Sequence, residues 1–484
     1  MSRRQDTGQC EPGGRRLGAS LRHMWTHSGD RNSSWLDPKA RWGAGLGIAL
    51  FVLLALLVGC GQGRERIEGA PGHSPAPDRV PVVFLPGVGR EVASVLRGGT
   101  LVPFSALALR TDAEALAHLG DPRFPGDGAA AAEAPPRLDR ALRGTDVRGL
   151  QKLLDYLIRE EGYVRGDPDY PRDKDYPENP PEIRQDRIQP ASLFVIYYDW
   201  RRDVPESACV IAERIARIRA ATASPRVLLV AHSLGGIVAR YYLRYGGRDA
   251  MRDRDCPVPA GESPAAVNAP GAGSVSHLAL FGVPHRGSVM AFRALLEDFS
   301  LFGFLALGLR DAAFSMPLAW QLLPSAEPDG RVPLLVGSNG EERVSLYVVN
   351  TWVRRGWLPG GGRDPERLRF VEAMLARSVA LQQSLAGRHP AEEAVPRLVV
   401  GGECRPTPAR GLSNEGGVQF LARGQADHPL FARATAPGDG VVTAESGLGL
   451  PVSPTLTLLT TCTGHNTYLD DPQLVARVVQ FLLR

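Results

Sequence analysis

Short apolar runs recur along the chain at the length of buried β-strands, and amphipathic stretches lie between several of them. The strand-like runs cover residues 80–85, 193–198, 227–231, 276–281, 398–400 and 455–460, and the helical patterns cover 147–161, 205–221, 237–245, 365–385 and 470–483. Such alternation is typical of a mostly parallel sheet with helices on both faces. The pattern therefore predicts one α/β domain over residues 80–484.

Four stretches interrupt this alternation. Residues 122–143, 167–190 and 249–273 are rich in Pro, Gly, Ala or charge and are predicted to be surface loops. Residues 288–324 instead carry many Phe and Leu with few charges, which is too apolar for an ordinary loop. This segment is predicted either to form a helical cap or lid over an apolar cleft or to be a buried helix pair.

The first 59 residues have the features of a leader segment. Eight Lys and Arg lie within residues 1–41 against four acids, and the uncharged residues 42–63 follow. The apolar part ends in Leu57-Val58-Gly59-Cys60, which resembles the lipobox of bacterial lipoproteins. That resemblance implies cleavage before Cys60, a lipid on its thiol and a tether over residues 60–79.

An uncleaved transmembrane anchor is the alternative for this segment, and Met24 is a second candidate start. In either case the protein is expected to be exported and anchored to a membrane, on the periplasmic or extracellular face.

Composition narrows the possible chemistry further. A net charge of +4 over 484 residues, without a basic stripe, gives no indication of nucleic-acid binding. The chain lacks metal-spaced Cys/His clusters and Gly-rich phosphate loops, so we expect neither a metal nor a cofactor. Beyond Cys60, three disulfide pairings are possible in an oxidising compartment. The four cysteines are Cys209, Cys256, Cys404 and Cys462, and the sequence does not choose among the pairings, although Cys404 with Cys462 is attractive because each follows a late predicted strand.

The run 226–230 leads directly into Ala231-His232-Ser233-Leu234-Gly235, and a helical pattern follows. This order of strand, tight turn and helix is that of a nucleophile elbow, which exposes the serine hydroxyl to a base. Ser233 is therefore the predicted nucleophile. His232 is expected to point away from Ser233 and to pack or hydrogen-bond beneath the elbow.

A serine nucleophile needs a base and an acid that orients the base. His465 lies just after the last strand-like run and before the closing helix, so it is the predicted base, with His285 as the runner-up. Asp439, in a Gly-flanked turn 26 positions earlier, is the predicted acid. Three further carboxylates are less well placed: Glu445, Asp470 and Asp471.

The oxyanion that forms during acyl transfer needs two backbone N–H donors. We expect one from Leu234, the residue after the nucleophile. The second is expected from Val88, in the Pro86-Gly87-Val88-Gly89 turn after the first strand.

Taken together, these motifs resemble lipases and acyltransferases of the lecithin:cholesterol acyltransferase-like branch of the α/β-hydrolases. The resemblance rests on their joint order: Leu85-Pro86-Gly87-Val88-Gly89, Tyr198-Asp199-Trp200-Arg201, Ala231 to Gly236, Pro284 to Ser288, Gly438 to Val442 and Gly464-His465. It implies an α/β-hydrolase fold, a Ser233-His465-Asp439 triad with Val88 and Leu234 as oxyanion donors, and a structural role for residues 198–201. Residues 317–324 resemble part of the family's cap.

The sequence thus predicts a membrane-tethered serine hydrolase that acts on lipid acyl esters. Water as acyl acceptor would make it a lipase or phospholipase, and an alcohol would make it an acyltransferase. A non-catalytic lipid- or partner-binding lipoprotein on the same fold and a thioesterase or amidase are the alternatives.

Overall fold

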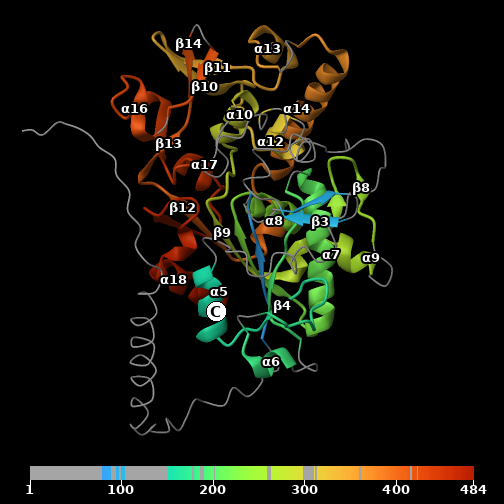
Figure 1. Ribbon diagram of the computed structural model, residues 1–484. Helices are drawn as coiled ribbons and strands as arrows, with labels where there is room; N and C mark the ends of the chain where they lie inside the picture. Colours follow the sequence, from blue (N-terminus) through green and yellow to red (C-terminus); the bar gives the residue numbers. More distant parts are fainter. Residues whose placement is uncertain are drawn as a thin grey trace, which may run out of the picture. The chain divides into compact units, whose positions relative to one another are not determined.

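The structure is a computed structural model (Figure 1). The structure describes residues 79–88, 94–97, 100–103, 151–176, 179–185, 190–200, 202–258, 263–297, 310, 313–314, 316–358, 362–414, 417–421 and 423–484. The predicted leader, Cys60, most of the tether and the predicted loop 122–143 lie outside these residues.

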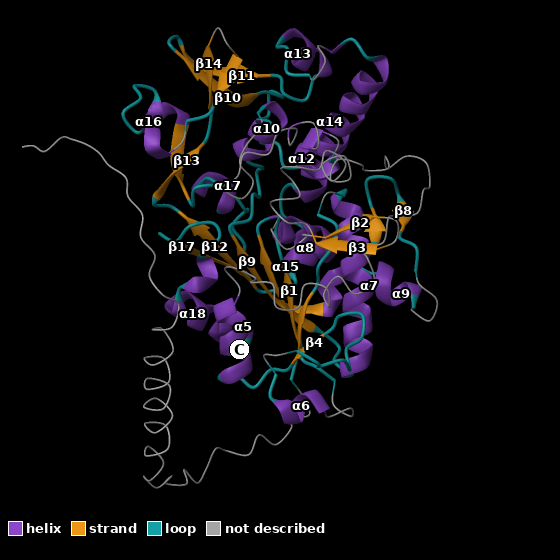
Figure 2. Ribbon diagram, in the orientation of Figure 1, coloured by secondary structure: helices purple, strands orange, loops and turns teal. Residues whose placement is uncertain are grey.

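A seven-stranded sheet with every pairing parallel forms the centre of the chain (Figure 2). Its strands, in spatial order, are β17 (Leu456–Thr461), β12 (Arg397–Gly402), β9 (Val275–Phe281), β6 (Val227–His232), β1 (Val82–Leu85), β5 (Leu193–Val195) and β4 (Arg165–Gly166). The six predicted strands are therefore confirmed. Because β1 is flanked by β5 and β6, the chain changes direction across the sheet there, which is where ligands bind in open α/β sheets.

Alternate residues of these strands enter two separate cores. On one face Val83, Leu229 and Leu280 pack with α7 (Val204–Thr222) and α8 (Leu234–Tyr245). On the other face Phe84 and Val230 pack with α5 (Gln151–Arg159) and α18 (Pro472–Leu482). Both faces are covered by helices, so the sequence's prediction of an α/β-hydrolase fold is confirmed.

A second layer of structure lies beyond the C-terminal ends of the strands. It combines the sheet β11-β10-β14-β15 with four helices and has an apolar core of its own. Its elements are β10 (Val332–Gly337), β11 (Gly340–Val344), β14 (Gly411–Asn414), β15 (Gly417–Gln419), α10 (Val289–Leu296), α12 (Pro317–Gln321), α13 (Val349–Arg354) and α14 (Pro365–Leu385).

The predicted cap segment 288–324 contributes α10 and α12 to this layer. Phe292, Leu295 and Trp320 are fully buried in its core, so the described part of the segment packs as buried helices. The stretch 298–309 lies outside the described residues, and a moving lid stays a prediction.

The remaining elements are short. They are β2 (Ser94–Arg97), β3 (Thr100–Pro103), β7 (Arg248–Asp249), β8 (Arg254–Asp255), β13 (Arg405–Pro408), β16 (Thr435–Gly438), α6 (Pro181–Gln185), α9 (Pro264–Asn268), α15 (Pro390–Glu393), α16 (Phe431–Ala434), α17 (Ala444–Gly447), η2 (Gly271–Ser274), η4 (Arg423–Gln425) and η5 (Tyr468–Asp470).

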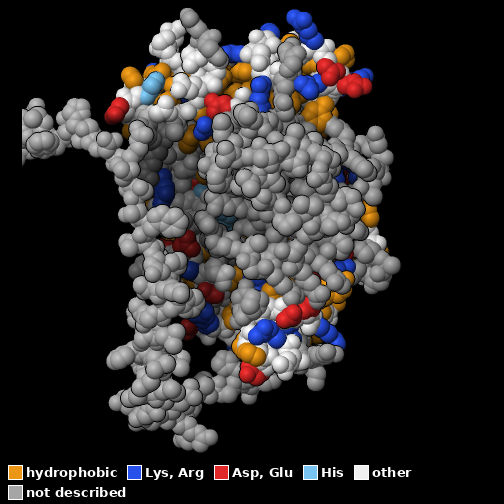
Figure 3. All heavy atoms as spheres, viewed as in Figure 1, with side chains coloured by type: hydrophobic (Ala, Val, Ile, Leu, Met, Phe, Trp, Pro, Cys, Tyr) orange, Lys and Arg blue, Asp and Glu red, His pale blue; other side chains and the backbone are white. Residues whose placement is uncertain are grey.

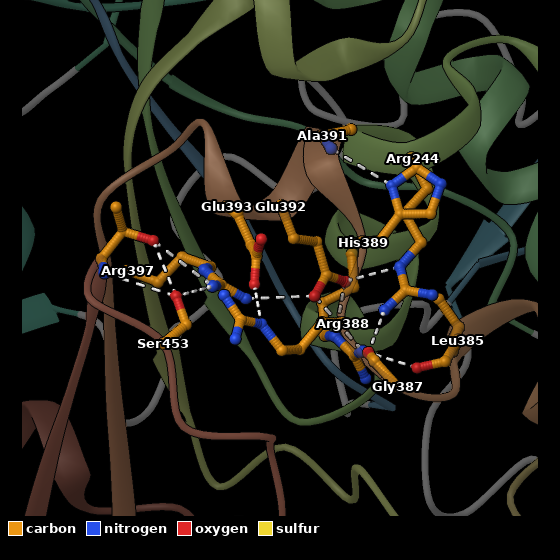
Figure 4. Close-up of polar contacts among 12 residues, drawn as sticks. Arg244, Leu385, Gly387, Arg388, His389, Ala391, Glu392, Glu393, Arg397 and Ser453 are labelled. Atoms are coloured by element: carbon orange, nitrogen blue, oxygen red, sulfur yellow. Dashed lines mark hydrogen bonds and ion pairs between the residues drawn. The ribbon is translucent and has the colours of Figure 1, made fainter.

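Buried ion pairs connect α15 to α8 and β12, and hydrogen bonds connect the end of α14 to α8. Glu392 lies between Arg244 of α8 and Arg397 of β12, and it also accepts from Arg240 (Figure 4). The two α8 guanidinium groups additionally donate to the carbonyls of residues 384–387, where α14 ends. These cations neutralise the negative end of the α14 dipole. Helix α8 therefore follows the nucleophile at its own N-terminus and holds the C-terminus of α14 through its arginines.

The prediction of a surface loop for residues 167–190 is wrong for part of that stretch. Tyr176 and Asn179 are buried, and the Asn179 side chain bonds both the N–H (2.9 Å) and the carbonyl (2.7 Å) of Arg165. The side-chain amide of Asn179 therefore completes the hydrogen bonds of strand β4. Residue composition does not indicate such a contact.

Two disulfides join segments far apart in sequence. Cys404 is bonded to Cys462, the pairing that the late strands favoured, and Cys209 is bonded to Cys256. On the face in Figure 3, basic and acidic side chains are interspersed over the described residues around the four-stranded sheet and α13. Within the described ranges, no helix combines the length and apolar character needed to cross a bilayer.

Candidate active site

Ser233 lies in a strained turn between β6 and α8. Its φ of 53° and ψ of −125° fall in a region that residues other than glycine rarely adopt. Its N–H donates to the Phe281 carbonyl of β9 (2.8 Å). Small residues make the turn possible, because a Cβ at Gly235 would lie 2.4 Å from the Leu85 carbonyl oxygen and one at Gly236 would overlap Val283. The geometry is that of a nucleophile elbow.

The three predicted triad residues meet at this turn. His465 Nε2 lies 3.0 Å from Ser233 Oγ, and His465 Nδ1 lies 2.8 Å from Asp439 Oδ2. With Nδ1–H donating to the carboxylate, Nε2 is left to accept the serine proton. The structure thus brings together residues that are 232 and 26 positions apart.

Asp439 is a buried carboxylate with a full set of donors. Its Oδ1 accepts from the amides of Val441 (2.9 Å) and Val442 (2.7 Å), and its Oδ2 accepts from His465 and from the Tyr468 hydroxyl (2.9 Å). Burial alone would raise the pKa of Asp439. The hydrogen bond and charge of His465, together with the two amides, lower this pKa by more than burial raises it, so the pKa lies below its ordinary value. Asp439 is therefore held ionised.

His465 is fixed through its main chain as well as its ring. Its N–H donates to the Asp439 carbonyl (3.1 Å), and its own carbonyl accepts from the His232 ring at Nε2 (2.8 Å). The Thr467 side chain accepts from Gly464 N–H (3.0 Å) and donates to the Gly464 carbonyl (3.1 Å), which closes the loop around the histidine.

Leu234, one predicted oxyanion donor, directly follows Ser233, and Gly87, the neighbour of the other predicted donor Val88, lies against Ser233. Leu234 is the first residue of α8, so its N–H has no partner within the helix. The loop of Val88 follows β1, whose last residue, Leu85, is in register with Ala231 of β6. A Cβ at Gly87 would lie 2.6 Å from that of Ser233, so only glycine allows this approach.

A hydrogen bond from Tyr198 holds the loop that carries Gly87 and Val88. The sequence predicted only a structural role for residues 198–201, without this contact. Tyr198, just beyond β5, donates its hydroxyl to the Pro86 carbonyl (2.7 Å). The buried phenol thus fixes the backbone immediately before Gly87 and Val88.

The alternative candidates lie elsewhere. Both His285 ring nitrogens are buried without a hydrogen-bond partner, and burial, followed by the charges of Arg240 and Arg397, lowers the pKa of this histidine. Glu445 is exposed and pairs with Arg286 (3.4 Å), while Asp471 caps α18.

The Tyr468 contact was not predicted, and for His232 a hydrogen bond beneath the elbow was one expectation but its partner was not named. Tyr468 lies three positions after His465, and an aromatic residue at that distance was the only signal in the sequence. The link between His232 and the His465 carbonyl depends on a fold contact across 233 positions. Among the described residues, no group of three His, Cys, Asp or Glu side chains could hold a metal ion.

No protein-family model matches the chain, and no curated protein sequence matches it. Several solved structures are similar to this chain at low sequence identity. One is from a Tle4–Tli4 complex, at TM-score 0.46 and 16% identity, covering 84% of this chain and 98% of that one. A second is the mature lipase BlEst2 of Bacillus licheniformis, at TM-score 0.33 and 12% identity, covering 86% of this chain and 96% of that one.

The third is EstA of Clostridium botulinum, at TM-score 0.30 and 13% identity, covering 60% of this chain and 78% of that one. With identities of 16% or less and TM-scores below 0.5, the function has to be argued from the site itself.

The Cys404–Cys462 disulfide supports the triad and is open to test by mutation. Cys404 directly precedes β13, whose Arg405 pairs with Gly438 beside Asp439, and Cys462 lies three positions before His465. We expect Cys404→Ser with Cys462→Ser to lower kcat about 10- to 100-fold, because small displacements of the acid and base are costly.

The Cys209–Cys256 pair is the matched control. The two disulfides span 58 and 47 residues, so chain entropy assigns each about 4 kcal/mol of stability. The prediction is an equal fall in melting temperature for both double variants, with kcat at 20 °C reduced only in the first. Equal kcat values would show that the Cys404–Cys462 link does not hold the site.

Proposed function

We propose that this chain is a serine esterase that cleaves lipid acyl esters through an acyl-enzyme on Ser233. The observation that carries the proposal is the unbroken series of hydrogen bonds from Ser233 through His465 to Asp439, which begins at a strained elbow. A binding protein has no need for a serine, an imidazole and a buried ionised carboxylate aligned in this order.

The geometry supports the following reaction. Ser233 Oγ attacks the ester carbonyl while its proton passes to His465 Nε2, and Asp439 stabilises the resulting imidazolium. The amides of Leu234 and Val88 hold the oxyanion. When the tetrahedral intermediate collapses, His465 gives its proton to the departing alcohol and the acyl group stays on Ser233. Water then attacks this ester with His465 again as base, which releases the acid and restores the serine.

The proposed substrate class follows from the chain's resemblance to lecithin:cholesterol acyltransferase-like enzymes and from its N-terminal segment. A lipobox-like Cys60 next to an apolar stretch would place the enzyme at a membrane, where its substrates are lipid esters. Transfer of the acyl group to an alcohol instead of water is a variant of the same reaction. Product analysis with and without added alcohol distinguishes the two.

The first test is Ser233→Ala. We expect turnover of p-nitrophenyl esters to fall by at least about 10⁴-fold, because the residue that carries the acyl group is lost. The melting temperature should stay within a few degrees of wild type, since only a hydroxyl is removed. A fluorophosphonate probe should label the wild type and not the variant.

Hydrolysis by Ser233→Ala at the wild-type rate would refute the assignment. An acyl-thioester or peptide substrate cleaved much faster than any ester would instead favour the thioesterase or amidase alternative.

Membrane attachment is tested at Cys60. Expressed in a bacterium that processes lipoproteins, the full chain should incorporate radiolabelled palmitate and sediment with membranes. The Cys60→Ala variant should do neither and yet keep its esterase activity, because Cys60 is not one of the residues to which the proposed reaction assigns a role. Palmitate incorporation that is unchanged in Cys60→Ala would contradict the lipoprotein proposal.

A further inference from the structure

Two side chains outside the triad make hydrogen bonds to its members in a direction that chemistry fixes. The Tyr468 hydroxyl donates to Asp439 Oδ2 (2.9 Å), and His232 donates from Nε2 to the His465 carbonyl (2.8 Å). Neither side chain has a part in the proposed proton transfers. Their rings also meet edge to face, with the two ring centroids 6.4 Å apart, so they form one connected layer beneath the acid and the base.

Tyr468 shares an acceptor atom with His465. Asp439 Oδ2 receives both the imidazole N–H and the phenol O–H, while Oδ1 is occupied by two backbone amides. Burial, and after it the Asp439 charge, raises the pKa of Tyr468 well above its ordinary value, so the phenol keeps its proton and stays a donor. The strength of Asp439 as an acceptor for His465 therefore depends on Tyr468.

His232 acts on the main chain of His465. Burial, followed by the charge of His465, lowers the pKa of His232 to about 3, so the ring is neutral at any working pH. A neutral ring has one N–H, and the carbonyl partner requires it to be at Nε2. The His465 peptide is then held on both sides, by Asp439 at its N–H and by His232 at its carbonyl.

We propose that Tyr468 and His232 are positioning residues of the triad, with Tyr468 tuning the grip of Asp439 on the imidazole and His232 fixing the backbone that carries it. The inference rests on the proposed hydrolase activity. If the two side chains only filled space, loss of the donor group alone would have no effect. Positioning residues instead act through their donors, the Tyr468 O–H and the His232 N–H, so removal of either donor should change catalysis.

For Tyr468→Phe, the readout is the pH profile of kcat/KM. With one donor fewer, Asp439 becomes a stronger acceptor for the imidazole N–H and stabilises a positive charge on that ring more strongly. The acid limb should move up by about 0.5 to 1 pH unit, with KM unchanged and kcat reduced less than about tenfold. Within the described residues, His465 and Tyr468 bond Asp439, His232 interacts with its charge and Arg405 interacts with Tyr468, and the substitution alters only the phenol.

For His232, two variants separate the donor from the ring. His232→Leu removes the N–H and should lower kcat about 10- to 100-fold at constant KM, because His465 is released from one of its two main-chain restraints. His232→Gln keeps an N–H at a similar distance from the backbone and should recover most of that loss.

Matched controls remove comparable groups at the far side of the fold. Tyr245→Phe loses a hydroxyl bond to the Ser384 carbonyl at the end of α8, and His277→Leu loses a ring that packs on Phe481 near the start of β9. Both should leave kcat and the pH profile unchanged. Melting temperature and fluorophosphonate labelling of Ser233 report whether each variant is folded.

An unshifted acid limb in Tyr468→Phe, or a His232→Gln as slow as His232→Leu, would overturn the inference while the esterase remained active. A folded wild type that neither cleaves esters nor takes the probe would instead refute the proposed function, and the inference with it.

Discussion

The positive φ of Ser233 is the constraint on which the site depends. The conformation lifts the hydroxyl away from the sheet, and it persists because the surrounding backbone leaves no alternative. The N–H of Ser233 is bonded to β9, while Gly235 and Gly236 allow α8 to start directly against β1 and Val283. A larger side chain at either glycine would push the helix away and release the turn.

The parallel sheet converts this local strain into a complete site. Strands β1, β6, β9, β12 and β17 all end at one edge, so the segments that follow them lie side by side although they are far apart in sequence. Asp439 reaches the same edge through β16, which pairs with β13 just after β12. The Cys404–Cys462 disulfide joins the base-bearing loop to this pairing. Glu392 pairs with Arg397 of β12 and with two arginines of α8, the helix behind the nucleophile, and these two arginines also bond the end of α14 in the second layer.

The sequence predicted the sheet and the triad contacts because both leave strong local patterns. Buried parallel strands are continuous apolar runs, and a serine elbow must have small residues at fixed positions. The sheet β11-β10-β14-β15 was missed because β14 and β15 have only four and three residues and the three central residues of β11, Gly340 to Val344, are charged. The Asn179 contact and the donors Tyr468 and His232 were beyond prediction in detail, since each depends on a partner that only the folded chain brings near.

The proposed reaction transfers an acyl group to Ser233 in every turnover, and rapid-quench mass spectrometry detects that group. A reaction with a p-nitrophenyl ester, stopped within the first turnover and digested, should show the added acyl mass on the peptide that contains Ser233. The amount should match the burst of p-nitrophenol. A burst with the acyl mass on a different residue, or steady turnover with no acylated peptide in an enzyme whose deacylation has been slowed, would contradict the account.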